Sequence, residues 1–194
     1  ITLFYGEAET GKTSLAMQCS MNMALMGMKT LFVDSDGTFS PERLSQIASQ
    51  DFDNVANSMI LVRPSSFEEQ AKIVDNLEKY IGKNFGLVVF DTITSLYRTG
   101  IDLENKKKTY RLNRELNRQV ATLAQIAKSL EITVLLASQV RGIFEFGQAN
   151  VKPVATRILR FWSNSIIGMS RLEQRNIVKA TVEKSGGKER KDTL

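Results

Sequence analysis

The most specific residue spacing occurs at residues 6–13, which match G-x-x-x-x-G-K-[ST] at every fixed position and read Gly6-Glu7-Ala8-Glu9-Thr10-Gly11-Lys12-Thr13. In such a loop, successive backbone N–H groups and the N-terminus of the next helix form a concave site for phosphate oxygens. Gly11 leaves out a Cβ where the backbone must approach phosphate. Lys12 would reach the β- and γ-phosphates, and the Thr13 hydroxyl would ligate Mg²⁺. These residues and the adjacent Ser14 therefore predict a site for a nucleoside triphosphate.

The elements on both sides of the loop are those that such a site requires. An apolar run at residues 1–5 predicts a strand, and Gly6 lets the backbone turn sharply off it. A helix is predicted over residues 11–27, with an apolar stripe formed by Leu15, Cys19, Met23 and Met26. A glycine turn that matches the pattern by chance is the alternative, and this strand–loop–helix context argues against it.

A second chemical signal lies at residues 87–91, where four apolar residues precede Asp91. In a protein with a phosphate loop, an aspartate at the end of such a strand holds Mg²⁺, usually through water, opposite the loop threonine. An aspartate that only starts a turn or caps a helix is the alternative. We therefore predict that Thr13 and Asp91 form the magnesium site.

The composition limits the classes of protein to which the chain can belong. The chain has 194 residues, 42% of them hydrophobic and 24% charged, which predicts one globular domain spanning residues 1–194. The sequence contains no histidine, so histidine-based triads and histidine metal sites are excluded. The single cysteine, Cys19, is expected to be a buried thiol, and the net charge of +5 weakly favours a polyanionic partner. We expect a cytoplasmic protein, and a start inside a predicted strand leaves open a segment upstream of Ile1.

Strands and helices alternate from residue 1 to residue 137. Further strands are predicted at residues 30–33, 58–62, 85–90 and 132–137, and helices at residues 66–81, at residues 109–130 and after Ser40-Pro41. This alternation predicts an α/β fold with a mainly parallel sheet flanked by helices. Residues 165–171 and 177–184, joined by a turn at 173–176, predict an antiparallel strand addition at the sheet edge.

Three stretches carry a resemblance to a known family. Residues 31–44 (LFVDSDGTFSPERL) resemble the stretch after the second core strand of the RecA/RadA recombinases. Residues 87–98 (LVVFDTITSLYR) resemble their Walker B strand with the segment after it, and residues 135–140 (LLASQV) resemble the strand that ends in a glutamine and opens their second DNA-binding loop. The resemblance covers nearly the whole chain and implies a RecA-like P-loop ATPase core that uses ATP and Mg²⁺. Within the family, the chain resembles a short archaeal paralogue of RadA that lacks the N-terminal helical DNA-binding domain.

The resemblance also implies roles for three further residues. Gln139 would sense the γ-phosphate and couple it to the following loop, although a polar residue that merely ends a strand is the alternative. Arg43 would stack on adenine, unless it is a solvated helix residue. Asp36 takes the place of a glutamate that orients the attacking water. Because its carboxylate is one methylene shorter, we expect slow hydrolysis, with Asp36, Lys12 and Gln139 as the catalytic residues.

Two basic segments, at residues 98–118 and 141–162, follow the strand ends that carry Asp91 and Gln139, and match the two DNA loops of the family. Basic residues with aromatic neighbours suit phosphate contact and base stacking in single-stranded DNA. Solvated helix faces, and core positions for Phe161 and Trp162, are the alternatives. Residues 141–152 show no period and predict a mobile loop, whereas residues 184–191 are either another basic segment or a tail. The candidate DNA contacts are Arg98, Lys106, Lys107, Lys108, Arg111, Arg141, Phe144 and Lys152.

Together, these features predict an ATP- and DNA-binding accessory protein of homologous recombination and DNA repair, with weak ATPase activity and no strand exchange on its own. ATP would order the 141–152 loop through Gln139. The DNA would be single-stranded or branched, and the resemblance implies RadA or a junction-processing nuclease as a partner, with a homo-oligomer left open. The alternatives are an ATP-gated protein-interaction module without DNA contact, and an active recombinase or helicase relative.

Overall fold

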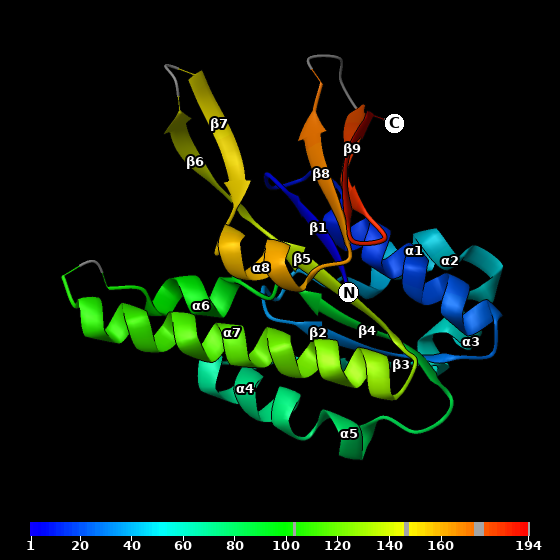
Figure 1. The fold of residues 1–194 in the computed structure, drawn as a ribbon. Coiled ribbons are helices and arrows are strands. Elements are labelled where there is room, and N and C mark those ends of the chain that lie inside the picture. Colours follow the sequence, from blue (N-terminus) through cyan, green and yellow to red (C-terminus); the bar gives the residue numbers. More distant parts are fainter. Residues whose placement is uncertain (103, 146–147, 173–176, 194) are drawn as a thin grey trace.

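An eight-stranded sheet forms the centre of the molecule, in the order β10-β9-β8-β1-β5-β4-β2-β3 (Figure 1). The structure is a computed structural model that describes residues 1–102, 104–145, 148–172 and 177–193. The strands from β8 to β3 in this order run parallel, so the predicted parallel sheet is confirmed. The strands of this sheet are β1 (Thr2–Gly6), β2 (Lys29–Asp34), β3 (Met59–Val62), β4 (Phe85–Asp91), β5 (Thr133–Ser138), β8 (Ser165–Arg171), β9 (Val178–Ser185) and β10 (Lys188–Thr193).

Helices cover both faces of the sheet and form two separate cores. One core is closed by α1–α3 and the other by α4–α8 (Figure 1). Along β4, Leu87 and Val89 point into the first core, whereas Val88 and Phe90 point into the second, as expected for a strand buried on both faces. The helices are α1 (Lys12–Leu25), α2 (Pro41–Ala48), the short 3₁₀ turn η1 (Ser49–Asp51), α3 (Phe52–Asn57), α4 (Phe67–Asp75), α5 (Leu77–Tyr80), α6 (Ser95–Gly100), α7 (Lys106–Ser129) and α8 (Thr156–Trp162).

The buried face of α1 differs from the predicted stripe. The helix buries Ala16, Met17, Ser20 and Ala24, whereas Leu15, Cys19 and Met23 are only partly buried and Met26 is 72% exposed. The apolar residues on this face, including the fully buried Met17, pack into the first core, and Leu15, Cys19 and Met23 pack against it from the side. Burial raises the pKa of the Cys19 thiol, as expected for a thiol that is packed and not reactive.

Side-chain caps start two of the helices, α2 and α4. The Ser40 hydroxyl accepts from the Arg43 backbone N–H at 3.1 Å at the start of α2, and Ser66 does the same for Glu69 at 3.1 Å in α4. The single helix predicted over residues 66–81 is wrong, because it breaks at Asn76 between α4 and α5. The Asn76 side chain donates to the Lys72 carbonyl at 2.8 Å, a local bond that competes with helix continuation.

The long helix α7 starts three residues before its predicted start, because Asn105 caps it by accepting from the Lys108 N–H at 3.0 Å. The helix buries Leu116, Val120 and Leu123, whereas Leu130 at the C-terminal end is 40% exposed. The helix also buries Gln119 completely, which no apolar pattern predicts. Among the described helices, including this one, none combines the length and apolar character needed to cross a membrane.

The C-terminal strands refine the predicted edge addition. Strand β8 runs parallel to β1, and the antiparallel pairing begins at β9 and continues to β10. Residues 188–193, which overlap the 184–191 segment that the sequence left as a basic stretch or a tail, form β10, because backbone pairing with β9 needs no apolar pattern. The turn predicted at residues 173–176 lies outside the described residues.

A second, two-stranded sheet replaces the predicted 141–152 loop. Strands β6 (Val140–Glu145) and β7 (Gln148–Pro153) pair antiparallel, with Arg141 opposite Lys152 and Phe144 opposite Ala149. The hairpin stands away from the main sheet in Figure 1. Antiparallel pairing is made by backbone groups, so it can form where side chains show no alternation. The prediction of an irregular loop was therefore wrong for the described part of this segment.

Two leucines of α7, one fully buried and one exposed, should respond differently to truncation. Leu116→Ala should lower the free energy of unfolding by about 2–5 kcal/mol, because it leaves a cavity under a fully buried side chain. Leu130→Ala is the matched control and should cost less than about 1 kcal/mol, because this leucine already contacts water. Urea unfolding of both variants measures the difference, and equal losses would contradict this assignment of the helix face.

Candidate nucleotide-binding site

The loop between β1 and α1 depends on both of its glycines. A Cβ at Gly6 would overlap the Met169 carbonyl oxygen on the neighbouring strand β8. Gly11 adopts a φ of 83° directly before the first residue of α1, a left-handed conformation that favours glycine. Close strand packing therefore requires the first glycine, and backbone conformation requires the second.

Lys12 is buried inside this loop. Its Nζ donates to the Gly6 carbonyl at 3.0 Å, to the Glu7 carbonyl at 2.5 Å and to Thr10 Oγ1 at 3.3 Å. Burial lowers the pKa of the Lys12 ammonium, whereas Asp91, Asp36 and Glu7 act in the opposite direction. The ammonium thus lines the cavity above the loop, where a phosphate oxygen could replace the carbonyl oxygens as its acceptor.

The two predicted metal ligands lie side by side. Thr13 Oγ1 donates to Asp91 Oδ2 at 2.5 Å, which joins the start of α1 to the end of β4. The described residues contain no group of three or more His, Cys, Asp or Glu side chains that could hold a metal ion alone. Two hard oxygens that leave most positions open suit Mg²⁺, which usually keeps several waters and takes phosphate oxygens as further ligands. The donor set therefore fits the predicted ion.

Burial disfavours the ionised form of Asp91. It is only 1% exposed, and burial raises the pKa of its carboxyl to about 6, with further upward contributions from Asp36 and Asp34. The hydrogen bond from Thr13 and the charge of Lys12 lower the pKa in part. A cation beside Asp91 would favour the ionised form and relieve this penalty.

Asp36 and Gln139 contact each other across the cavity. Gln139 Nε2 donates to Asp36 Oδ2 at 3.1 Å, and Gln139 Oε1 accepts from the Arg98 guanidinium. These three side chains line a cavity of about 570 Å³ together with Lys12, Thr13 and Asp91. The carboxyl ends of β2, β4 and β5 bring these groups together, because parallel strands end at the same edge of the sheet.

The loop that carries Asp36 is fixed by a residue pair that sequence reasoning missed. Asp34 accepts from the backbone N–H groups of Thr38 at 3.0 Å and Phe39 at 3.2 Å, and from Arg63 Nε at 2.9 Å. Arg63 also donates to the Phe39 carbonyl at 3.0 Å. An aspartate that precedes a turn could have indicated the first contacts. Nothing in the sequence indicates Arg63, which follows the edge strand β3.

The remaining predicted nucleotide contacts divide into two groups. Glu7, Ala8 and Glu9 line the cavity, and Arg171 on β8 forms an ion pair with Glu9. Arg43 and Ser14 do not line it but contact each other at 3.4 Å beside the start of α1. Arg43 Nη1 also donates to Gln46 at 3.2 Å, and its guanidinium is exposed. Adenine stacking by Arg43 thus stays a prediction.

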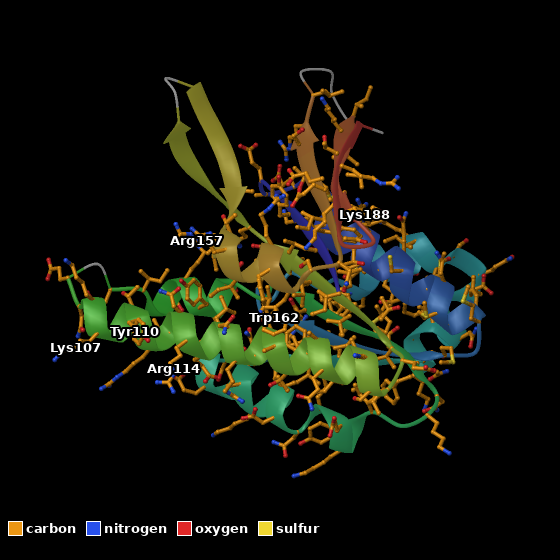
Figure 2. The ribbon with its side chains drawn as sticks, viewed as in Figure 1. Lys107, Tyr110, Arg114, Arg157, Trp162 and Lys188 are labelled. Atoms are coloured by element: carbon orange, nitrogen blue, oxygen red, sulfur yellow. The ribbon has the colours of Figure 1, made fainter. Side chains whose placement is uncertain are left out.

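A groove of about 890 Å³ lies beside the nucleotide cavity, between α6, α7 and the start of α8. Polar and basic side chains on its lining include Arg98, Thr109, Asn113 and Arg157; we call this surface the α6–α8 groove. Arg157 lies at the start of α8, above the half of α7 that carries the labelled Lys107, Tyr110 and Arg114 (Figure 2). The first turns of α7 expose four of the predicted DNA contacts, Lys106, Lys107, Lys108 and Arg111.

Two cations counted in the basic segments are paired. Arg118 bonds Asp75 at 2.5 Å and Glu115 at 2.7 Å, whereas Arg160 bonds Glu183 at 2.5 Å and Glu189 at 2.7 Å. The number of basic residues in these segments therefore overstates their free positive charge. For Arg141, Phe144 and Lys152 only the backbone, in the β6–β7 hairpin, is described, and their side chains lie outside the described structure.

Fold and site together define a RecA-like P-loop ATPase core, with the phosphate loop after the first strand and polar groups after β2, β4 and β5. The chain belongs to the Rad51 family, whose model matches residues 1–183. Proteins of the wider RecA/Rad51 family are ATPases that use ATP and Mg²⁺. The resemblance stated from the sequence is therefore confirmed at the level of the family.

Relatives named RadB resemble this chain over most of its length. The DNA repair and recombination protein RadB of Methanococcus maripaludis strain C5 is 33% identical over 184 residues, which cover 95% of this chain and 81% of the relative. RadB of Thermococcus onnurineus is 35% identical over 187 residues, covering 95% and 79%. A crystal structure of the RadB recombinase superposes with a TM-score of 0.76 at 31% identity, covering 95% of this chain and 80% of that one.

The burial of Asp91 predicts a pH-dependent stability difference. Asp91→Asn should raise the free energy of unfolding of the nucleotide-free protein at pH 7.5 by on the order of 1–3 kcal/mol, because it removes a buried charge. A folded-state pKa of about 6, above the ordinary 3.8, means that the penalty is complete above pH 6 and disappears as the pH falls toward 3.8. The difference in the free energy of unfolding between Asp91→Asn and the wild type should therefore decrease as the pH falls from 6 toward 3.8.

Urea unfolding at pH 7.5, 6 and 4.5 measures this difference. Asp53→Asn, at an exposed aspartate on α3, serves as the control and should change stability little at any of these values. An Asp91→Asn variant that is no more stable than the wild type at pH 7.5 would show that the carboxylate is already compensated.

Proposed function

We propose that this protein is an ATP- and DNA-binding accessory factor of recombination and DNA repair, with slow ATP hydrolysis. The observation that carries the proposal is the position of the α6–α8 groove directly beside the nucleotide cavity, with Arg98 on both linings. The names of the RadB relatives, described as DNA repair and recombination proteins, support the same reading.

Nucleotide binding would use the groups that converge on the cavity. Backbone N–H groups of the loop and the Lys12 ammonium would hold the phosphates, while Thr13 and Asp91 would hold Mg²⁺. The ion would neutralise negative charge on the phosphates. Asp36 would orient a water molecule. In this structure, the hydrogen bond from Gln139 orients the Asp36 carboxylate.

The short Asp36 carboxylate predicts a rate that can be raised by lengthening it. Asp36→Glu should increase kcat for ATP hydrolysis by about tenfold, because the carboxylate moves closer to hydrogen-bond reach of an attacking water. Asp36→Asn is the isosteric control and should lower the rate below that of the wild type. Steady-state phosphate release and separate nucleotide titrations measure rate and affinity. Equal rates in all three proteins would exclude Asp36 from the reaction.

DNA binding would use the cations along the groove and along α7 that form no ion pair within the described part of the chain. Arg98 and Arg157 line the groove, and exposed lysines follow on the first turns of α7. Tyr110, which is 67% exposed, adds an aromatic face near these charges. Such a combination suits the phosphates and bases of single-stranded DNA.

Removing one groove cation should weaken DNA binding in a salt-dependent manner. Arg157→Gln should reduce affinity for single-stranded DNA by about threefold to tenfold and reduce the salt slope by about one. Lys188→Gln is the control, because Lys188 is also exposed but lies on β10, outside the groove lining (Figure 2). Fluorescence anisotropy over a salt series measures both effects. Equal losses in the two variants would indicate nonspecific charge attraction.

An ATP-gated protein-interaction module is the second candidate function. The pairing of Arg118 and Arg160 with carboxylates favours it, because these contacts remove two cations from the DNA-facing segments. A recombinase such as RadA or a junction-processing nuclease would then be the partner. Negligible DNA affinity at physiological salt, with nucleotide binding intact, would support this candidate over the first.

A further inference from the structure

Arg98 belongs to two sites at once. Among the described residues, its side chain lines both the nucleotide cavity and the α6–α8 groove. Strand β4 ends at Asp91 and α6 begins at Ser95, so a short connection holds Arg98 near the magnesium ligands. Its Nη1 donates to Gln139 Oε1, and the guanidinium otherwise lies at an exposed position.

The Gln139 amide is engaged at both of its ends. A carboxylate only accepts and a guanidinium only donates, so Asp36 and Arg98 together fix which end of the amide faces each of them. Gln139 therefore cannot turn toward another group in the cavity without giving up at least one of these bonds. Arg98 holds the amide in this orientation from the side of the groove.

We propose that Arg98 has two alternative partners, Gln139 Oε1 in the cavity and a DNA phosphate oxygen in the groove, and that exchange between them couples the two sites. A Gln139 side chain that turns away from Arg98 frees a guanidinium that suits phosphate. A phosphate contact in the groove likewise draws Arg98 away and frees Gln139. Because coupling between two binding sites is reciprocal, each ligand should favour the other. This inference rests on the proposed DNA-binding function.

Arg157 provides a matched control for this role. It lines the same groove and is exposed, but it does not line the nucleotide cavity. Arg98→Gln and Arg157→Gln therefore remove the same charge from the same groove, and only the first removes the bond to Gln139. Arg98→Lys keeps a cationic donor that can serve either partner, so it tests rescue by a conservative change.

The experiment measures the affinity for a fluorescent single-stranded oligonucleotide without nucleotide, with ADP and with a non-hydrolysable ATP analogue. The wild type should bind about tenfold more tightly with the analogue than without nucleotide, the range expected for a charge-assisted hydrogen bond. Arg157→Gln should weaken binding in all three states and keep this ratio. Arg98→Gln should bring the ratio to within about twofold of one, and Arg98→Lys should largely restore it.

A second titration omits DNA and compares the analogue with ADP. Arg98→Gln should shift the preference severalfold toward the analogue, because Gln139 is no longer held, whereas Arg157→Gln should leave it unchanged. Thermal melting establishes that each variant is folded. An Arg98→Gln variant that keeps the wild-type ratio would overturn the inference while DNA binding stands. Wild-type protein that binds no DNA in any nucleotide state would overturn both.

Discussion

The burial of Asp91 at the end of β4 is the constraint on which the site depends. Its carboxylate lies at the edge of the sheet where Thr13, Lys12 and Asp36 also arrive, and burial holds its pKa near 6. A charge in such a position needs a cation, and the hydrogen bond from Thr13 offers only partial compensation. In the proposed function, Mg²⁺ beside this pair would supply that cation and take phosphate oxygens as further ligands.

Polar contacts that cross between elements give the site its present arrangement. Asp34 and Arg63 fix the loop that carries Asp36, while Gln139 connects this loop to Arg98 on α6. Carboxylates only accept hydrogen bonds and guanidinium groups only donate them. These contacts therefore determine the orientation of the side chains as well as their proximity. The nucleotide cavity and the α6–α8 groove are therefore neighbours joined through one glutamine and one arginine.

Much of the fold was predictable, because the relevant signals are local. The Ser40 and Ser66 caps, the apolar run of β4 and the phosphate loop depend on residues within one turn or one strand. The predictions failed where packing decides. Packing against the sheet decides which face of α1 is buried. The buried Gln119 is tolerated because Gln70 on α4 donates to it at 2.8 Å.

The sequence by itself determined that a phosphate loop, a strand-end aspartate and a glutamine-ended strand occur in an α/β chain, because motif spacing and periodicity encode local geometry. Tertiary structure alone decided which charges remain free. Arg118 and Arg160 form ion pairs with carboxylates on other elements. Arg98 instead donates to the neutral side chain of Gln139, 41 positions further along the chain. Such pairings depend on how distant segments pack in three dimensions, and residue types along the chain do not specify them.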